Sequence, residues 1–391
     1  EFRRVLFRSY FKADGTPEET YNRYLNSVGY PGVNPWHDYA NSGEGANGEV
    51  LSGWNMRNAR QAARAREEHS ETAFCTDQAM AFMREQGEAP WCLHLSYIKP
   101  HWPYIAAAPY HAMYGKKDML AAVRSEDERR NANPVYGAFM RHQDSQSFSR
   151  DEVRETVIPT YMGLVKQIDD HLGRLFRHME ASGRMKDTLI VLTADHGDFL
   201  GDHWLGEKEL FYEQSARVPM IVADPDEAAP RGVVSDELVE SIDLVPTFIE
   251  ALGHAAPMHI LEGRSLLPAV RHGRPVGRET AFSELDYATY LARDILGRGV
   301  NDCRAVMART RRWKYVHFDG YAPQLFDMEN DPAELRDLGC DAAHAAVRAQ
   351  MKERIFDWMR GRKNRVAMSD EDLNSRFEDR RRPGTALIGR W

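Results

Sequence analysis

The segment Thr193–Leu210, TADHGDFLGDHWLGEKEL, concentrates side chains that bind metals and anions. Asp195 and His196 stand side by side directly after an apolar run, Leu189–Leu192. A carboxylate oxygen beside an imidazole nitrogen suits a divalent cation such as Mn²⁺ or Zn²⁺, and suits Ca²⁺ less well because Ca²⁺ prefers oxygen. The ammonium of Lys208 could return to the same place and hold an anionic ester oxygen. The segment therefore predicts a divalent-metal site with Asp195 and His196 as ligands.

The same residues also allow a purely structural interpretation. Asp195-His196-Gly197 could be a polar turn after a strand, in which the Asp195 carboxylate caps backbone amides. Gly197 lets the backbone turn sharply in either case. We expect Asp202 and His203 to hold the loop rather than contact a ligand.

The elements that would position these residues follow from hydrophobic periodicity. The expected elements are a helix over residues 69–86, a strand over 91–98, a helix over 153–183, strands over 187–195 and 218–225, and a helix over 241–253. Apolar strands that alternate with helices predict a mostly parallel sheet covered on both faces, hence an α/β fold. Ligands of such sheets sit at the carboxyl ends of the strands, where Asp195 and His196 lie.

After about residue 263, the sequence pattern changes from alternating strands and helices to short strands separated by turns. TAFSEL, CRAVMARTRRWKYVHF and PQLFDMENDPAEL read as short strands of an antiparallel sheet, and DAAHAAVRAQMKERIFDWMRGR as a final amphipathic helix. We therefore divide the chain into an edge at 1–10, a partial α/β domain at 11–262, an α+β subdomain at 263–363 and a tail at 364–391. The edge is expected to be foreign or disordered, and the tail to be loose or to form an oligomerisation arm.

Composition excludes several classes of protein. A formal net charge of −8 and a pI near 6 argue against a dedicated nucleic-acid binder. No stretch is apolar for long enough to span a bilayer. The four cysteines have no CxxC spacing, which favours a reducing compartment, so we expect a cytoplasmic rather than a periplasmic location.

Four segments together resemble the sulfatase family of the alkaline phosphatase superfamily. LIVLTADHGDFLGDHWLGEKELFYEQSARVPMIV resembles its C-terminal metal-site segment, and LHLSYIKPHWPY resembles its strand and following Pro-His-Pro-like loop. YMGLVKQIDDHLGRL resembles its long helix, and RRWKYVHFDGYAPQLFDMENDPAELRDLG its closing hairpin. The resemblance spans about Thr72 to Gly339 and implies an alkaline phosphatase-like fold. The Asp-His pair is most similar to the phosphonate monoester hydrolase and phosphodiesterase branch.

The resemblance implies a two-part site for ester hydrolysis. Asp195 and His196 would bind one divalent metal ion (Mn²⁺, Ca²⁺ or Zn²⁺), and Lys208 would contact the substrate anion. His101, in KPHWPY, would contact the ester or protonate its leaving group, although it could also be a structural loop histidine. The nucleophile would be a formylglycine made from the Cys or Ser of a C/S-x-P-x-R motif.

The chain departs from the family at that nucleophile. None of its cysteines or serines is followed by x-P-x-R, and the family's first strand with its acidic metal pair is also missing. We expect these features in an N-terminal segment outside the 391 residues. Two ligands alone rarely hold a metal tightly, so the fragment as given is expected to be inactive.

The expected function is metal-dependent hydrolysis of sulfate, phosphodiester or phosphonate monoesters. One alternative is a phosphoglycerate-mutase-like or nucleotide-pyrophosphatase-like metalloenzyme, which would add further His ligands and a Ser or Thr nucleophile. Another is a non-catalytic, sulfatase-like binding protein. The expected partners are a small anionic ester and, through the C-terminal tail, a second copy of the chain, without nucleic acid or membrane.

Overall fold

The structure is a computed structural model that describes residues 2–6, 19–363, 369, 371–372 and 374–375. Its contacts divide the chain into two units. The first unit comprises Glu1–Arg124, Met140–Asp187 and Phe199–Glu207, and the second comprises Ser125–Phe139, Thr188–Asp198 and Lys208–Trp391. This division interleaves the chain, whereas the sequence analysis set one boundary at residue 262. Most of the tail at 364–391, with its predicted oligomerisation arm, lies outside the described residues.

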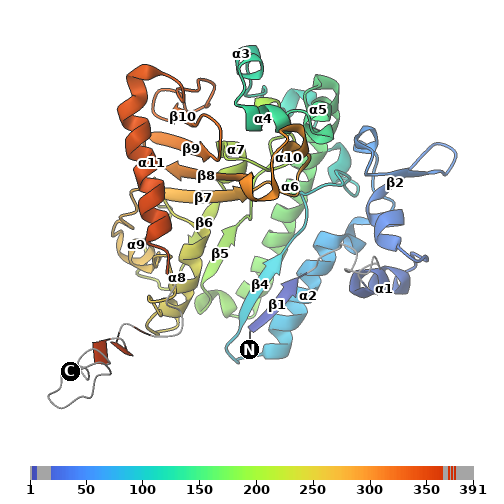
Figure 1. The fold of residues 1–391 in the computed structure, drawn as a ribbon. Coiled ribbons are helices and arrows are strands. Elements are labelled where there is room, and N and C mark those ends of the chain that lie inside the picture. The colour runs from blue at the N-terminus through green and yellow to red at the C-terminus, as the bar shows by residue number, and fades with distance from the viewer. Residues whose placement is uncertain (1, 7–18, 364–368, 370, 373, 376–391) are drawn as a thin grey trace, which may run out of the picture. The chain divides into compact units, whose positions relative to one another are not determined.

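The first unit is built around two long helices (Figure 1). Its elements are β1 (Phe2–Leu6), α1 (Glu19–Ser27), β2 (Ser42–Glu44), β3 (Val50–Ser52), α2 (Glu71–Gln86), β4 (Cys92–Ser96), α5 (Gln143–Phe148) and α6 (Asp151–Ala181). Helix α6 packs against α2, and α2 packs against β4. The short strands β2 and β3 form an antiparallel pair.

The two long helices have the boundaries that their sequences favour. Ser70 caps α2, because its Oγ accepts a hydrogen bond from the backbone N–H of Ala73 at 3.2 Å. Helix α6 ends just before Gly183, whose φ of +75° favours glycine, as the sequence predicts. Val157 and Leu164 on the predicted apolar face of α6 are buried.

Strand β1 lies in the amino-terminal edge that the sequence analysis expects to be foreign or disordered. Phe2–Leu6 pair in parallel with Cys92–Ser96 of β4. Backbone hydrogen bonds can hold such a strand whatever its side chains are. The foreign origin of this segment stays a prediction, and residues 7–10 lie outside the described residues.

The second unit contains a four-stranded sheet and several short helices. Its elements are α3 (Glu126–Arg130), α4 (Pro134–Phe139), β5 (Ile190–Thr193), α7 (Glu213–Ala216), β6 (Met220–Ala223), α8 (Leu244–Ala251), α9 (Leu267–His272), β7 (Ala281–Asp286), α10 (Leu291–Ile295), β8 (Arg304–Arg309), β9 (Trp313–Phe318), β10 (Gln324–Asp327) and α11 (Ala345–Arg360).

The C-terminal part of the second unit is the predicted α+β arrangement. Strands β7 to β10 are antiparallel, in the order β10-β9-β8-β7. Helix α11 packs on β8 and β9, as Figure 1 shows. Tyr315 and Leu325 of the sheet and Met351 and Ile355 of α11 form their common core. The predicted antiparallel sheet with its closing helix is therefore confirmed.

The pairing of β5 with β6 is antiparallel, which corrects the prediction that these two apolar strands belong to a parallel sheet. Thr193 lies opposite Met220, so the chain leaves β5 and re-enters β6 at the same end of the pair. Apolar periodicity cannot distinguish the two pairings, because it reports burial and not strand direction. Nor is the pair fully buried, since Ile221 is 61% exposed. The loop between the strands, residues 194–219, therefore starts and finishes close together.

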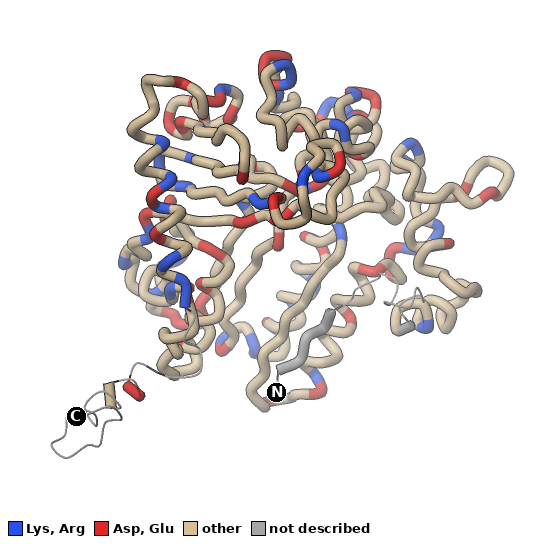
Figure 2. Tube along the Cα trace, in the orientation of Figure 1, with Lys and Arg blue, Asp and Glu red and all other residues tan. Residues whose placement is uncertain are grey.

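Charged residues of both signs are interspersed over each unit (Figure 2). Within the described residues, no helix is both long enough and apolar enough to cross a membrane.

Candidate functional site

The turn after β5 carries both predicted metal ligands. His196 Nε2 lies 3.5 Å from Asp195 Oδ2, and the side chains are 32% and 87% exposed, respectively. The backbone N–H of His196 donates to Asp195 Oδ1 at 3.0 Å. Two ligand atoms that each lie about 2.1 Å from a tetrahedral ion are about 3.4 Å apart. The observed separation therefore fits two ligands of one ion.

The His196 ring is oriented by its own backbone. Nδ1 lies 2.8 Å from the carbonyl oxygen of Gly197. Because a carbonyl oxygen only accepts, Nδ1 carries the hydrogen in this pairing and Nε2 keeps its lone pair on the side of Asp195. Histidine ligands in metal sites are commonly fixed in this way. The donor set of one imidazole nitrogen and one carboxylate fits Mn²⁺ or Zn²⁺.

Gly197 is required by the close approach of a second segment. A Cβ at this position would lie 1.8 Å from the carbonyl oxygen of Gln214. The backbone N–H of Gly197 donates to the carbonyl oxygen of Ser215 at 2.9 Å. The turn that carries Asp195 and His196 is thus held against α7 by main-chain contact.

Lys208 is linked to the same helix. The Ser215 hydroxyl donates to the carbonyl oxygen of Lys208, and Ser215 is buried. Ser215 therefore contacts the backbone on both sides, at Gly197 and at Lys208. In the second unit, Ser215 thus links the backbone next to Asp195 and His196 with the backbone of Lys208. The common site of these three residues stays a prediction.

His101 lies in the first unit, in the loop after β4. Its backbone N–H donates to the Ile98 carbonyl oxygen at 3.0 Å, and its Nδ1 lies 2.9 Å from the carbonyl oxygen of Trp102. The imidazole also packs on the Trp102 ring, with centroids 4.6 Å apart. With Nδ1 directed at a carbonyl, Nε2 is the ring nitrogen suited to meet a substrate oxygen. The role of His101 in the site stays a prediction.

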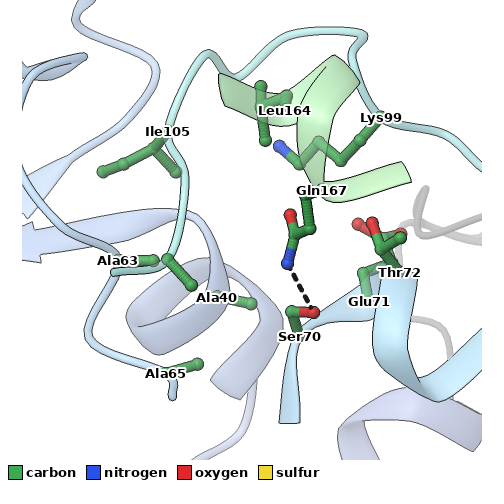
Figure 3. A pocket seen from close by; sticks show the side chains of 11 residues that line it. Ala40, Ala63, Ala65, Ser70, Glu71, Thr72, Lys99, Ile105, Leu164 and Gln167 are labelled. Atoms are coloured by element: carbon green, nitrogen blue, oxygen red, sulfur yellow. Dashed lines mark hydrogen bonds between the residues drawn. The ribbon is translucent and has the colours of Figure 1, made fainter. Parts of the chain in front are cut away.

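The loop of His101 is fastened by a buried lysine. Lys99 Nζ donates to Asn41 Oδ1 at 2.8 Å and to the Pro103 carbonyl oxygen at 2.6 Å, so it closes the loop around His101. Figure 3 shows Lys99 in a small pocket together with Glu71 of α2. Burial lowers the pKa of Lys99 to about 8, and the nearby Glu71 carboxylate opposes this shift.

Asp202 and His203 hold their loop, as predicted. Asp202 Oδ1 accepts a hydrogen bond from the Val123 N–H at 3.0 Å. The His203 N–H donates to the Val123 carbonyl oxygen at 2.8 Å, and the residue is fully buried. Both residues therefore fasten residues 199–207 to the segment around Val123 in the first unit.

The sequence analysis did not identify the residues that hold the Asp195–His196 turn in place. Ser215 and Glu213 lie in the FYEQSARVP motif, but their contacts are set by the fold. Lys314 stands between the apolar residues Trp313 and Tyr315, but a lysine in a strand does not by itself indicate burial. Among the described residues there is no group of three or more His, Cys, Asp or Glu side chains arranged to hold a metal.

A family model described as Sulfatase matches residues 7–254, which is more than half of the chain. The chain belongs to the sulfatase family. A second model, described as N-sulphoglucosamine sulphohydrolase, C-terminal, matches residues 201–361 of this sulfatase-family chain. Between them, the two matches include Asp195, His196, Lys208 and the C-terminal sheet.

Two curated relatives share this assignment. The multifunctional alkaline phosphatase superfamily protein PehA of Trinickia caryophylli is 34% identical over 313 residues, which cover 76% of this sulfatase-family chain and 60% of PehA. The choline-sulfatase of Rhizobium meliloti (strain 1021) is 29% identical over 281 residues, covering 68% of this chain and 51% of that protein. The chain thus spans between about half and three fifths of the length of these relatives.

Two solved structures match the fold at similar identity. The phosphonate monoester hydrolase SpPMH from Silicibacter pomeroyi has a TM-score of 0.80 and 31% identity, covering 89% of this chain and 70% of its own. The phosphonate monoester hydrolase of Agrobacterium radiobacter has a TM-score of 0.76 and 29% identity, covering 87% and 68%. The alkaline phosphatase-like fold expected for this sulfatase-family chain is therefore confirmed.

Proposed function

We propose that this chain supplies the metal pair and the anion contacts of a metal-dependent hydrolase of sulfate, phosphodiester or phosphonate monoesters. The observation that carries the proposal is the 3.5 Å separation of His196 Nε2 and Asp195 Oδ2, with the imidazole oriented through Nδ1. Membership of the sulfatase family supports the hydrolase class and favours it over a phosphoglycerate-mutase-like or nucleotide-pyrophosphatase-like enzyme.

Asp195 and His196 would hold one divalent ion, Mn²⁺, Zn²⁺ or Ca²⁺. When bound, the ion would supply Lewis-acid chemistry, which neutralises an ester oxyanion and lowers the pKa of a coordinated nucleophile. Asp195 would contribute a carboxylate oxygen and His196 the lone pair of its Nε2 to the ion.

Lys208 and His101 would act on the ester itself. The ammonium of Lys208 would bind a non-bridging anionic oxygen as a point charge, which gains strength as negative charge grows during attack. Nε2 of His101 would contact the leaving-group oxygen and, in the protonated form, transfer its proton to that oxygen. Lys99 would keep the His101 loop closed while this happens.

The nucleophile of this proposal is a formylglycine; no C/S-x-P-x-R motif that could give one occurs within the 391 residues. Names of the relatives support the choice of ester: one is a choline-sulfatase and two are phosphonate monoester hydrolases. The proposed partner is a small anionic ester, and the proposed location is the cytoplasm. A second copy of the chain, bound through the tail, completes the proposed partners.

The test uses a longer form of the protein that includes a C/S-x-P-x-R segment, produced together with a formylglycine-generating enzyme. It should hydrolyse an aryl sulfate, an aryl phosphodiester or an aryl phosphonate monoester, and a chelator should abolish the activity. Asp195→Ala or His196→Ala should reduce kcat/KM by orders of magnitude.

His344→Ala is a matched control for the histidine. Its ring also contacts an aspartate, with Nδ1 3.0 Å from Asp341 Oδ2, but the pair precedes α11 in the C-terminal part. It should leave activity unchanged. Full activity of the Asp195→Ala and His196→Ala variants would refute the site, and ester binding without turnover in the wild type would instead support a binding protein.

A further inference from the structure

Lys314 is a buried lysine in the C-terminal sheet of the second unit. It lies on β9 and its side chain is 1% exposed. Its Nζ lies 2.7 Å from Glu213 Oε1 and 2.7 Å from Glu334 Oε1, and it donates to the Phe211 carbonyl oxygen at 2.9 Å. One ammonium thus faces two carboxylates and one carbonyl group.

Two of these contacts converge on the start of α7. Glu213 opens that helix, and its backbone N–H donates to Glu334 Oε2 at 2.8 Å. The carboxylate of Glu334 is therefore shared between Lys314 and the main chain of Glu213. The segment 211–213 is tied to the C-terminal sheet through side chain and backbone at once.

The next residues of the same helix reach the candidate site. Ser215 lies two positions after Glu213. Its carbonyl oxygen accepts the N–H of Gly197, and its hydroxyl donates to the carbonyl oxygen of Lys208. A continuous series of contacts therefore leads from Lys314 through α7 to the metal-pair turn and to Lys208.

Stability alone does not account for the cluster. Burying charged groups costs several kcal/mol per ion, and a well-packed apolar replacement is often as stable as a buried ion pair. Here a lysine and a glutamate are each 1% exposed. The cluster does connect β9 to the start of α7, because the Lys314 ammonium contacts Glu213 and the Phe211 carbonyl oxygen.

We propose that Lys314, through Glu213 and Glu334, is a positioning residue that sets the geometry of the Asp195–His196 pair from the C-terminal sheet. The proposal rests on the proposed function only in calling this pair a metal site. Its structural part, the control of α7 and of the Gly197 turn, stands on the contacts themselves.

The test titrates the full chain with Mn²⁺ alone and follows paramagnetic broadening of the His196 ring resonances. These resonances are assigned with His196→Ala. In Lys314→Met, the Mn²⁺ concentration for half-broadening should rise by about 10-fold or more, as is typical when a supporting residue of a metal site is lost. Glu334→Gln should give a smaller rise, because an amide oxygen can still accept the Glu213 N–H.

Arg278→Met is the matched control. Arg278 is another buried cation of the second unit. It pairs with Glu240 and with Asp243, and neither of these residues belongs to α7. This variant tests whether the loss of any buried ion pair weakens Mn²⁺ binding at Asp195 and His196. In Arg278→Met, the Mn²⁺ concentration for half-broadening should stay at the wild-type value. An equal rise of this concentration in Lys314→Met and in Arg278→Met would overturn the proposal.

Amide hydrogen exchange of Gly197 separates this proposal from the proposed function. Lys314→Met should speed exchange at Gly197 selectively, whether or not Mn²⁺ binds. If the wild-type His196 ring does not respond to Mn²⁺ but Gly197 still exchanges faster in Lys314→Met, the metal assignment fails and the positioning role stands. Unchanged Gly197 exchange in Lys314→Met and in Glu334→Gln overturns the positioning role. If Lys314→Met does not fold, the decision rests on Glu334→Gln measured against Arg278→Met.

Discussion

Gly197 and Ser215 are joined by a main-chain hydrogen bond of 2.9 Å, which holds the turn after β5 against helix α7. The approach is so close that any Cβ on Gly197 would meet the Gln214 carbonyl oxygen at 1.8 Å. Gly197 and Ser215 are 18 positions apart in the sequence, yet their contact fixes the residue that directly follows Asp195 and His196.

Gly197→Ala should therefore push this turn away from α7. Overpacking of this kind costs roughly 1–3 kcal/mol in free energy of unfolding, and urea denaturation measures it. The control is Gly115→Ala, because the added methyl group would meet nothing within 4 Å there. It should change the free energy of unfolding by less than about 0.5 kcal/mol. Equal stability of the two variants would show that the turn can move freely.

Lys208→Met should weaken binding of an ester anion while leaving the backbone contact with Ser215 in place, since that contact uses only the Lys208 carbonyl oxygen. Loss of a charged hydrogen bond of about 1.5–3 kcal/mol corresponds to roughly 10- to 100-fold weaker binding. Isothermal calorimetry with inorganic sulfate and phosphate, in the presence of Mn²⁺, measures this. The exposed Lys186→Met is the control. Undiminished anion binding by Lys208→Met would remove Lys208 from the site.

His101→Gln should affect esters according to their leaving groups. In a form of the protein that contains the nucleophile segment, kcat should fall by about 10²- to 10⁴-fold for an alkoxide leaving group, which needs a proton. It should fall much less for nitrophenolate, which leaves as an anion. The exposed His94→Gln on β4 serves as the control. An equal loss with both leaving groups would assign His101 to the loop structure alone.

The lowered pKa of Lys99 predicts that the free energy of unfolding depends on pH. This pKa is lowered to about 8 in the folded chain by burial, against the opposing charge of Glu71, from an ordinary value of 10.5. Between these two values the unfolded chain binds more protons, so the stability that depends on Lys99 rises with pH from about 8 to 10.5. The wild type should gain up to roughly 3 kcal/mol relative to Lys99→Met across this window.

Urea denaturation of the wild type and of Lys99→Met at pH 7, 8, 9 and 10 measures this difference. Because both proteins share every other titrating group, the difference isolates Lys99. A difference in unfolding free energy that stays constant with pH would contradict the lowered pKa.

Much of the fold could be read from local pattern. Helix α6 and its end near Gly183, helix α2 and the antiparallel C-terminal sheet with α11 all follow from hydrophobic periodicity and from turn residues. These features depend on near neighbours in the chain. The direction of β6 relative to β5 does not, so the sequence predicted a parallel arrangement where the strands are antiparallel.

For the site, the sequence by itself determined the residue types and their order: Asp195, His196 and Gly197 are consecutive and follow a strand, which predicts a metal-type pair. Only the tertiary structure decided what holds that pair in place. Ser215, Glu213, Lys314 and Glu334 come from distant positions and meet because the antiparallel return to β6 and the C-terminal sheet bring them together. Burial of an ammonium with two carboxylates is a property of packing in three dimensions, which no local pattern of residues records.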